Sequence, residues 1–143
     1  MSYLQFQQEG ESNMSNQSFS EKVVSVSNDK LYDLSMLYDM DDDEYVAQIL
    51  TIFLRDVPKD LREMKDGLSA GKINQVYSAA HKLKSSAGVI QAYRLSMLLE
   101  QIETMSRTGQ LTNELANNIE EARSEYNKIQ PPLLGILKGL MDI

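Results

Sequence analysis

Apolar residues recur at every third or fourth position through most of this chain, and this spacing limits the possible folds more than any other feature. The longest run contains Val46, Ile49, Leu50, Phe53, Leu54, Val57, Leu61, Met64 and Leu68. Such spacing places the apolar side chains on one face of an α-helix. No segment shows the strict alternation of a half-buried strand, and only 7 glycines and 3 prolines occur. The sequence therefore predicts an all-α protein.

A short first helix is expected near the N-terminal end of the patterned region. It should begin after Ser27 or Asn28, since both side chains accept hydrogen bonds well at a helix N-terminus. Met36 should be exposed, opposite a buried face made of Leu31, Leu34, Leu37 and Tyr38. The acidic run at 39–44 then lacks the glycine and the distal glutamate of a calcium loop. We interpret it as a turn that caps the next helix, and predict no metal site.

Four longer amphipathic helices follow, with their apolar positions at 46–68, 73–90, 95–105 and 115–129. Pro58 should kink or split the first of them, because proline removes a helical hydrogen bond. Pro131 and Pro132 should interrupt the last one, so that the remaining residues dock as a final turn or short helix. Short connections favour an up-down-up-down four-helix bundle, preceded by the short extra N-terminal helix.

The composition sets the domain organisation and excludes several classes of partner. A polar segment at 1–27 is expected to form a flexible N-terminal arm, and 28–143 a bundle with a C-terminal extension. The net charge of −7 opposes nucleic-acid binding. No signal sequence and no run of about 18 apolar residues occurs, so we expect a cytoplasmic protein without a membrane segment. Bundles of this size need no partner to fold, and a monomer is expected.

His81 is the only histidine of the chain, and it lies within the helical pattern at 73–90. On a helix turning by about 100° per residue, it falls roughly 140° from the middle of the apolar stripe. Its imidazole should therefore point outward. The residues that share its face are Tyr77, Ser78, Lys84, Ser85 and Gly88.

A lone outward imidazole is compatible with few reactions. There is no cysteine and no second histidine for a zinc site, and no glycine-rich phosphate loop for a nucleotide. We therefore expect no cofactor, and no enzyme with a nucleotide site of its own. The imidazole can still accept a phosphoryl group brought by another protein. Lys84 would stabilise the added charge, while Ser85 and Gly88 are small enough to let a partner approach. Glycine costs about 1 kcal/mol in mid-helix, which suggests that the approach at Gly88 is close.

The run HKLKSSAGVIQAYRLSMLLEQIE resembles the signature of histidine-containing phosphotransfer (HPt) domains, and the likeness extends over about residues 28–130. The resemblance implies a four-helix bundle preceded by a short helix. It also implies that His81 is phosphorylated, that Lys84 assists the phosphoryl group, and that Gly88 lines the site. Two positions depart from the common pattern. Ser85 stands where many members have glycine, and Gln91 replaces a glycine, which should make the following turn less sharp.

The sequence as a whole favours a phosphocarrier of a two-component phosphorelay. His81 would shuttle a phosphoryl group between aspartates of response-regulator receiver domains, and the partners would be such receivers, a hybrid histidine kinase, or both. Two alternatives remain open. The chain would be an interaction module that binds receiver or kinase domains without phosphotransfer, or a separately encoded phosphoacceptor domain of a histidine kinase. A one-histidine hydrolase ranks last, because no paired nucleophile can be named.

Overall fold

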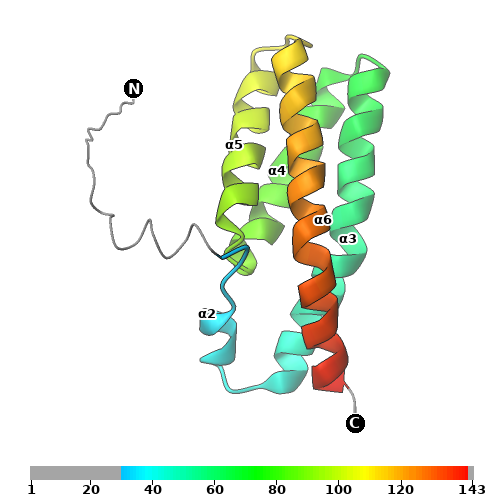
Figure 1. The fold of residues 1–143 in the computed structure, drawn as a ribbon. Coiled ribbons are helices and arrows are strands. Elements are labelled where there is room, and N and C mark those ends of the chain that lie inside the picture. Colours follow the sequence, from blue (N-terminus) through cyan, green and yellow to red (C-terminus); the bar gives the residue numbers. More distant parts are fainter. Residues whose placement is uncertain (1–29, 142–143) are drawn as a thin grey trace, which may run out of the picture. The chain divides into compact units, whose positions relative to one another are not determined.

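The computed structural model describes residues 30–141, and this part of the chain is built from helices without a strand (Figure 1). The expected all-α class is confirmed. The helices are α2 (Ser35–Tyr38), α3 (Asp43–Ser69), α4 (Ile73–Val89), α5 (Tyr93–Arg107) and α6 (Asn113–Met141). The predicted arm at 1–27 lies outside the described residues. No described helix combines the length and apolarity that a bilayer span requires.

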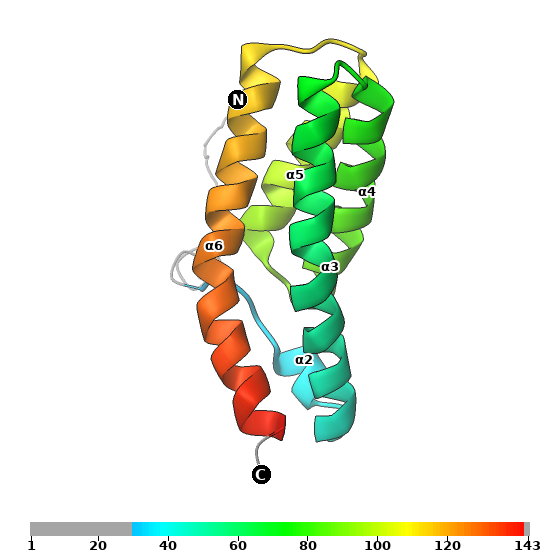
Figure 2. The same cartoon turned by 90° about the vertical axis from the view of Figure 1, so that its right-hand side faces the viewer.

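The four long helices form the predicted up-down-up-down bundle (Figures 1 and 2). Each packs against its neighbours in a closed ring, with contacts between α3 and α4, α4 and α5, α5 and α6, and α6 and α3. Figure 2 shows α3 and α6 continuing past the turn between α4 and α5, where α2 accompanies them. The largest fully buried side chains include Leu50, Met64, Leu83, Ile90, Leu99, Ile102, Ile119 and Ile129, so every long helix contributes to one aliphatic core.

The first helix is shorter than the pattern predicts. It is a single turn, and the predicted start at Ser27 or Asn28 lies outside the described residues. Leu34 and Leu37 are buried as expected, and Met36 is 65% exposed. The prediction that Tyr38 is buried is wrong, since it is 46% exposed. A single helical turn can bury only a few side chains, and here Leu34 and Leu37 are the buried ones.

The prolines do not end their helices. The sequence predicts that Pro58 kinks or splits its helix; α3 is unbroken there, so the split is wrong, and the kink stays a prediction. The predicted interruption at Pro131 and Pro132 is also wrong, because α6 continues through both to Met141. Each proline leaves the carbonyl four residues earlier without its helical donor. For Pro131 and Pro132 these carbonyls belong to exposed residues, where water can bind them. Buried side chains on both sides of the prolines, Ile129, Leu133 and Leu137, keep the helix in register.

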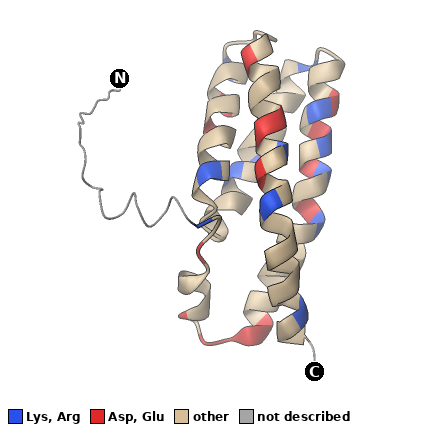
Figure 3. Ribbon diagram, in the orientation of Figure 1, with Lys and Arg blue, Asp and Glu red and all other residues tan. Residues whose placement is uncertain are grey.

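Polar side chains cap two of the long helices as the sequence predicts. Asp42 accepts a hydrogen bond from the Tyr45 backbone N–H (3.1 Å) at the start of α3. The acidic segment before α3, red in Figure 3, also places negative charge at the positive end of the helix dipole. Thr112 accepts from the Leu115 N–H (3.1 Å) and so caps α6. The acidic run at 39–44 thus has a structural role at a helix start.

The turn between α4 and α5 is sharp, contrary to the expectation drawn from Gln91. The backbone φ of Gln91 is +51°, in the left-handed region that glycine usually occupies. The Ala92 N–H donates to the Ala87 carbonyl (3.0 Å), and the Gln91 N–H donates to the Gly88 carbonyl (3.1 Å). These are the two hydrogen bonds of a Schellman motif. Glycine is therefore not required for the tight connection, although a non-glycine residue adopts this conformation at a cost.

This cost predicts that Gln91→Gly stabilises the protein. Relief of the left-handed strain should exceed the extra conformational freedom of glycine in the unfolded chain, for a net gain of about 0.5 to 1 kcal/mol. Urea unfolding followed by circular dichroism measures the change. Gln91→Ala is the matched control, because it removes the side chain but keeps the strain, and it should show no gain. A glycine variant less stable than the parent would contradict the argument.

Candidate functional site

His81 lies in the middle of α4 with its imidazole in solvent. The side chain is 62% exposed, as the helical geometry predicts. The inward face of the same segment holds Val76, Ala80, Leu83 and Ala87, all buried. Packing of that stripe against the core fixes the rotation of α4 about its axis. The fold therefore presents the only histidine of the chain on the outer surface of the bundle.

A buried carboxylate from α5 holds both His81 and Lys84. Glu103 Oε2 lies 2.6 Å from His81 Nδ1, and Glu103 Oε1 lies 2.6 Å from Lys84 Nζ. The Glu103 side chain is only 4% exposed, whereas that of Lys84 is 35% exposed. A buried charge needs such partners, because its desolvation is otherwise costly. Glu103 thus anchors the two residues that the sequence singles out and connects α4 to α5.

The sequence analysis assigned no role to Glu103, although a signal was present. Its position on α5 is in register with the core residues Leu99 and Ile102. It is the only charged residue among the buried positions of that helix, which are Leu95, Leu98, Leu99, Ile102, Glu103 and Ser106. A carboxylate on a core-facing stripe requires a hydrogen-bonding or charged partner. The outward-facing cation and imidazole of the preceding helix are such partners.

The charges of this cluster stabilise one another. Hydrogen bonds from Lys84 and His81 hold the pKa of the Glu103 carboxyl below its ordinary value of 4.5. The same hydrogen bond to Glu103 raises the pKa of the Lys84 ammonium. Because the pKa of Glu103 is lower in the folded than in the unfolded chain, its stabilising contribution is present above the unfolded value. The contribution is lost as the pH falls through the lower pKa that Glu103 has in the folded chain.

The carboxylate also selects the reactive nitrogen of His81. An ionised carboxylate only accepts hydrogen bonds, so the Nδ1 that faces Glu103 carries the proton. In the neutral imidazole the other nitrogen, Nε2, then holds the free lone pair. Nδ1 is therefore occupied by its contact with Glu103. The arrangement therefore leaves Nε2 as the nucleophilic atom on the exposed side chain.

The other two predicted residues of the site, Ser85 and Gly88, are exposed on α4 beyond His81. A Cβ added at Gly88 would meet no atom within 4 Å. Packing within this chain therefore does not require glycine there, and the space beside the helix is open to another molecule. No group of three or more His, Asp or Glu side chains in the described residues is arranged to hold a metal ion.

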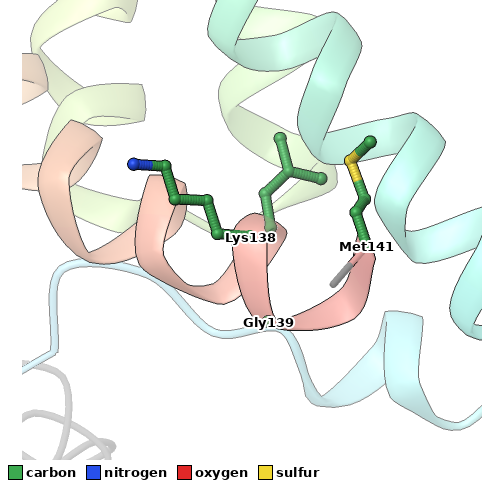
Figure 4. Close-up of a pocket in the computed structure, with 4 residues that line it drawn as sticks. Lys138, Gly139 and Met141 are labelled. Atoms are coloured by element: carbon green, nitrogen blue, oxygen red, sulfur yellow. The ribbon is translucent and has the colours of Figure 1, made fainter. Parts of the chain in front are cut away.

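An open surface pocket of about 520 Å³ lies elsewhere, at the C-terminal end of α6 (Figure 4). Leu137, Lys138, Gly139 and Met141 line it. None of the four residues predicted for the site is among them. The pocket and the exposed imidazole of His81 therefore lie at different places on the bundle.

Comparisons with known proteins agree with this geometry. A family model described as "Hpt domain" matches residues 48–128, a range that includes both the histidine and the buried glutamate. The fold is similar to that of histidine-containing phosphotransfer protein B (HptB) from Pseudomonas aeruginosa PAO1, with a TM-score of 0.70 and 23% sequence identity. That match covers 76% of this chain and 95% of the other. No significant match is found among curated proteins.

Proposed function

This chain belongs to the Hpt domain family, and we propose that it is a phosphocarrier that shuttles a phosphoryl group between receiver-domain aspartates through His81. The observation that carries the proposal is the exposed imidazole whose Nδ1 is held by a buried carboxylate. That contact leaves Nε2 free to react. The chain needs no nucleotide site for this role, because the phosphoryl group arrives already activated on the partner.

The chemistry proposed for His81 is an in-line displacement at phosphorus. The Nε2 lone pair attacks the phosphorus of an aspartyl phosphate, the Nε2–P bond forms, and the P–O bond to the aspartate breaks. The electron pair leaves on the aspartate carboxylate. The imidazole keeps its Nδ1 proton, and the positive charge that develops on the ring is stabilised by Glu103 at 2.6 Å. Return of the phosphoryl group to a second receiver follows the same steps in reverse.

Lys84 is the cation proposed to assist the phosphoryl oxygens. Its ammonium donates a hydrogen bond to Glu103, the same residue that holds the imidazole of His81. The Lys84 side chain is also partly exposed, so it can reach a group bound at Nε2. Glu103 offsets part of its charge in the resting state. We therefore assign Lys84 a supporting role, weaker than that of a buried cation.

Exposed apolar side chains next to the site are the proposed docking surface for a receiver. Met36, Val89, Tyr93 and Met97 form this surface, which we call the turn patch, and they are 65%, 45%, 63% and 45% exposed. The Gln91 side chain contacts Met36 Sδ (2.7 Å) and so brings α2 to the turn between α4 and α5. Val89 lies eight residues beyond His81, which is about 12 Å along a helix. A partner on the turn patch can therefore reach Nε2.

The turn patch predicts that Tyr93→Ala weakens binding to a cognate receiver about tenfold, because aromatic side chains contribute strongly to protein interfaces. Isothermal titration calorimetry measures the dissociation constant. Leu111→Ala is the matched control, since Leu111 is also exposed (46%) but lies in the connection between α5 and α6, beyond the other end of α5. Equal affinities for the two variants would place the receiver elsewhere, and chemical-shift mapping would locate it.

The proposed function is tested by incubating the protein with phosphorylated receiver domains and following the label. We expect an acid-labile, base-stable phosphoryl group on His81, and its transfer to a second receiver. Binding without uptake of label would favour the interaction module. Labelling only by a purified kinase core with ATP would favour the separately encoded phosphoacceptor domain. Absence of both binding and label would reject the proposal.

A further inference from the structure

The side chains of Tyr77 and Arg107 form a stack with His81 and have no role in the chemistry described so far. Tyr77 lies one turn before His81 on α4, and the two rings are nearly parallel, with 14° between their planes and 6.0 Å between their centroids. The guanidinium of Arg107 lies over the Tyr77 ring, with Cζ 5.8 Å from the centroid. Arg107 is the last residue of α5. The stack therefore joins the same two helices as Glu103.

The hydrogen bond to Glu103 alone does not fix the direction of Nε2. It fixes one atom of the ring, Nδ1, on a side chain that is 62% exposed. The imidazole can still turn about the line from Nδ1 to the carboxylate. Displacement at phosphorus depends on the direction of the attacking lone pair, which lies in the plane of the ring. A parallel aromatic ring restricts that plane, because tilting the imidazole would break the stacked contact.

We infer that Tyr77 is a positioning residue that holds the plane of the His81 imidazole for phosphoryl transfer, and that Arg107 keeps Tyr77 in place. The inference rests on the proposed function. Tyr77 occupies the side of His81 toward the N-terminus of α4. The other side, toward Ser85 and Gly88, stays open, since a Cβ at Gly88 would meet no atom within 4 Å. The stack thereby directs Nε2 to a donor that approaches from the side of the turn patch.

The inference can be tested without a receiver by using phosphoramidate as the phosphoryl donor. Attack by Nε2 forms the N–P bond, the P–N bond of phosphoramidate breaks, and protonated nitrogen leaves as ammonia. Tyr77→Phe keeps the ring and should react at the parental rate. Tyr77→Leu removes it and should react on the order of tenfold more slowly, since small errors in orientation are costly. Arg107→Gln should slow the reaction about two- to fivefold, and Arg107→Lys should restore it.

Tyr45→Leu is the matched control, because it removes an exposed tyrosine from the start of α3, outside both the stack and the turn patch. It should leave the reaction with phosphoramidate unchanged. NMR supplies a second readout, because the ring-proton shifts of His81 should change in Tyr77→Leu and stay as in the parent in Tyr77→Phe. If Tyr77→Leu reacts with phosphoramidate at the parental rate, the inference is overturned.

The two proposals fail in different ways. If the parent protein takes no phosphoryl group from any receiver but Tyr77→Leu still lowers reactivity toward phosphoramidate, the phosphocarrier function fails and the positioning role stands. If receivers phosphorylate the parent and Tyr77→Leu equally fast, the positioning role fails and the phosphocarrier function stands. Thermal unfolding of each variant shows whether a slower reaction merely follows loss of the fold. If Tyr77→Leu is unfolded, the comparison of Arg107→Gln with Arg107→Lys becomes the test.

Discussion

Replacement of His81 by glutamine is expected to abolish uptake of phosphate from a phosphorylated receiver. Glutamine keeps a side chain that can hydrogen-bond to Glu103, but it has no nucleophilic nitrogen. The rate should fall to background, because His81 is the only histidine of the chain and no other imidazole can substitute for it. Rapid mixing with a labelled receiver, followed by gel electrophoresis under alkaline conditions, measures the acid-labile product.

The fold should survive this change. His81 is 62% exposed, and surface substitutions usually change stability by no more than about 0.5 kcal/mol. An unchanged melting curve, together with unchanged receiver affinity, would assign the loss to chemistry. A glutamine variant that carries phosphate as well as the parent does would remove His81 from the mechanism and the phosphocarrier proposal with it.

Replacement of Glu103 by alanine is expected to have the next largest effect on the rate of transfer, although this buried residue is not proposed to contact the receiver. Charge-assisted hydrogen bonds are worth about 1.5 to 3 kcal/mol, and a loss of that size at the transition state slows a reaction about 10- to 100-fold. Glu103→Gln should lose less, because its amide oxygen still accepts from Nδ1. Single-turnover transfer rates at saturating receiver separate this effect from binding, which should not change because Glu103 is buried.

Lys84 shares this carboxylate, so the effects of the two residues should not add. Lys84→Ala alone is expected to slow transfer on the order of tenfold, less than the loss of a buried oxyanion donor. In the double variant the loss should be smaller than the product of the single losses, because both residues belong to one hydrogen-bonded network. Full multiplicativity would show that Lys84 and Glu103 act independently, and parental rates in Glu103→Ala would restrict that residue to a structural role.

The fold could be predicted from the sequence where side-chain periodicity determines structure. The apolar positions of α3, α4 and α5 extend over enough turns to predict both that these segments are helical and which side of each is buried. The same periodicity predicted that His81 is exposed. Local rules failed where tertiary packing competes with them. Leu133 and Leu137 continue the buried face of α6 beyond Pro131 and Pro132, and this burial outweighs the two lost hydrogen bonds.

The site could be predicted only in part, for a related reason. The neighbours of His81 along α4 follow from helical spacing, whereas Glu103 comes from another helix 22 residues away. A pattern read along one helix contains no information on which side chain of a neighbouring helix lies opposite. The sharp turn at Gln91 was missed because its left-handed conformation is imposed by the two hydrogen bonds that close α4, and glutamine itself gives no sign of it.

The unequal lengths of the helices divide the bundle into two regions of different thickness. Among residues 30–141, only α2 and the ends of α3 and α6 extend beyond the turn between α4 and α5 (Figure 2). Regions with fewer packed neighbours open by local unfolding at a lower free energy than the core. Met36 belongs to this thin region, whereas His81 and Glu103 lie among four helices. We therefore expect the thin end to open by local unfolding while the helices around His81 stay folded, which would change the exposure of Met36 in the turn patch.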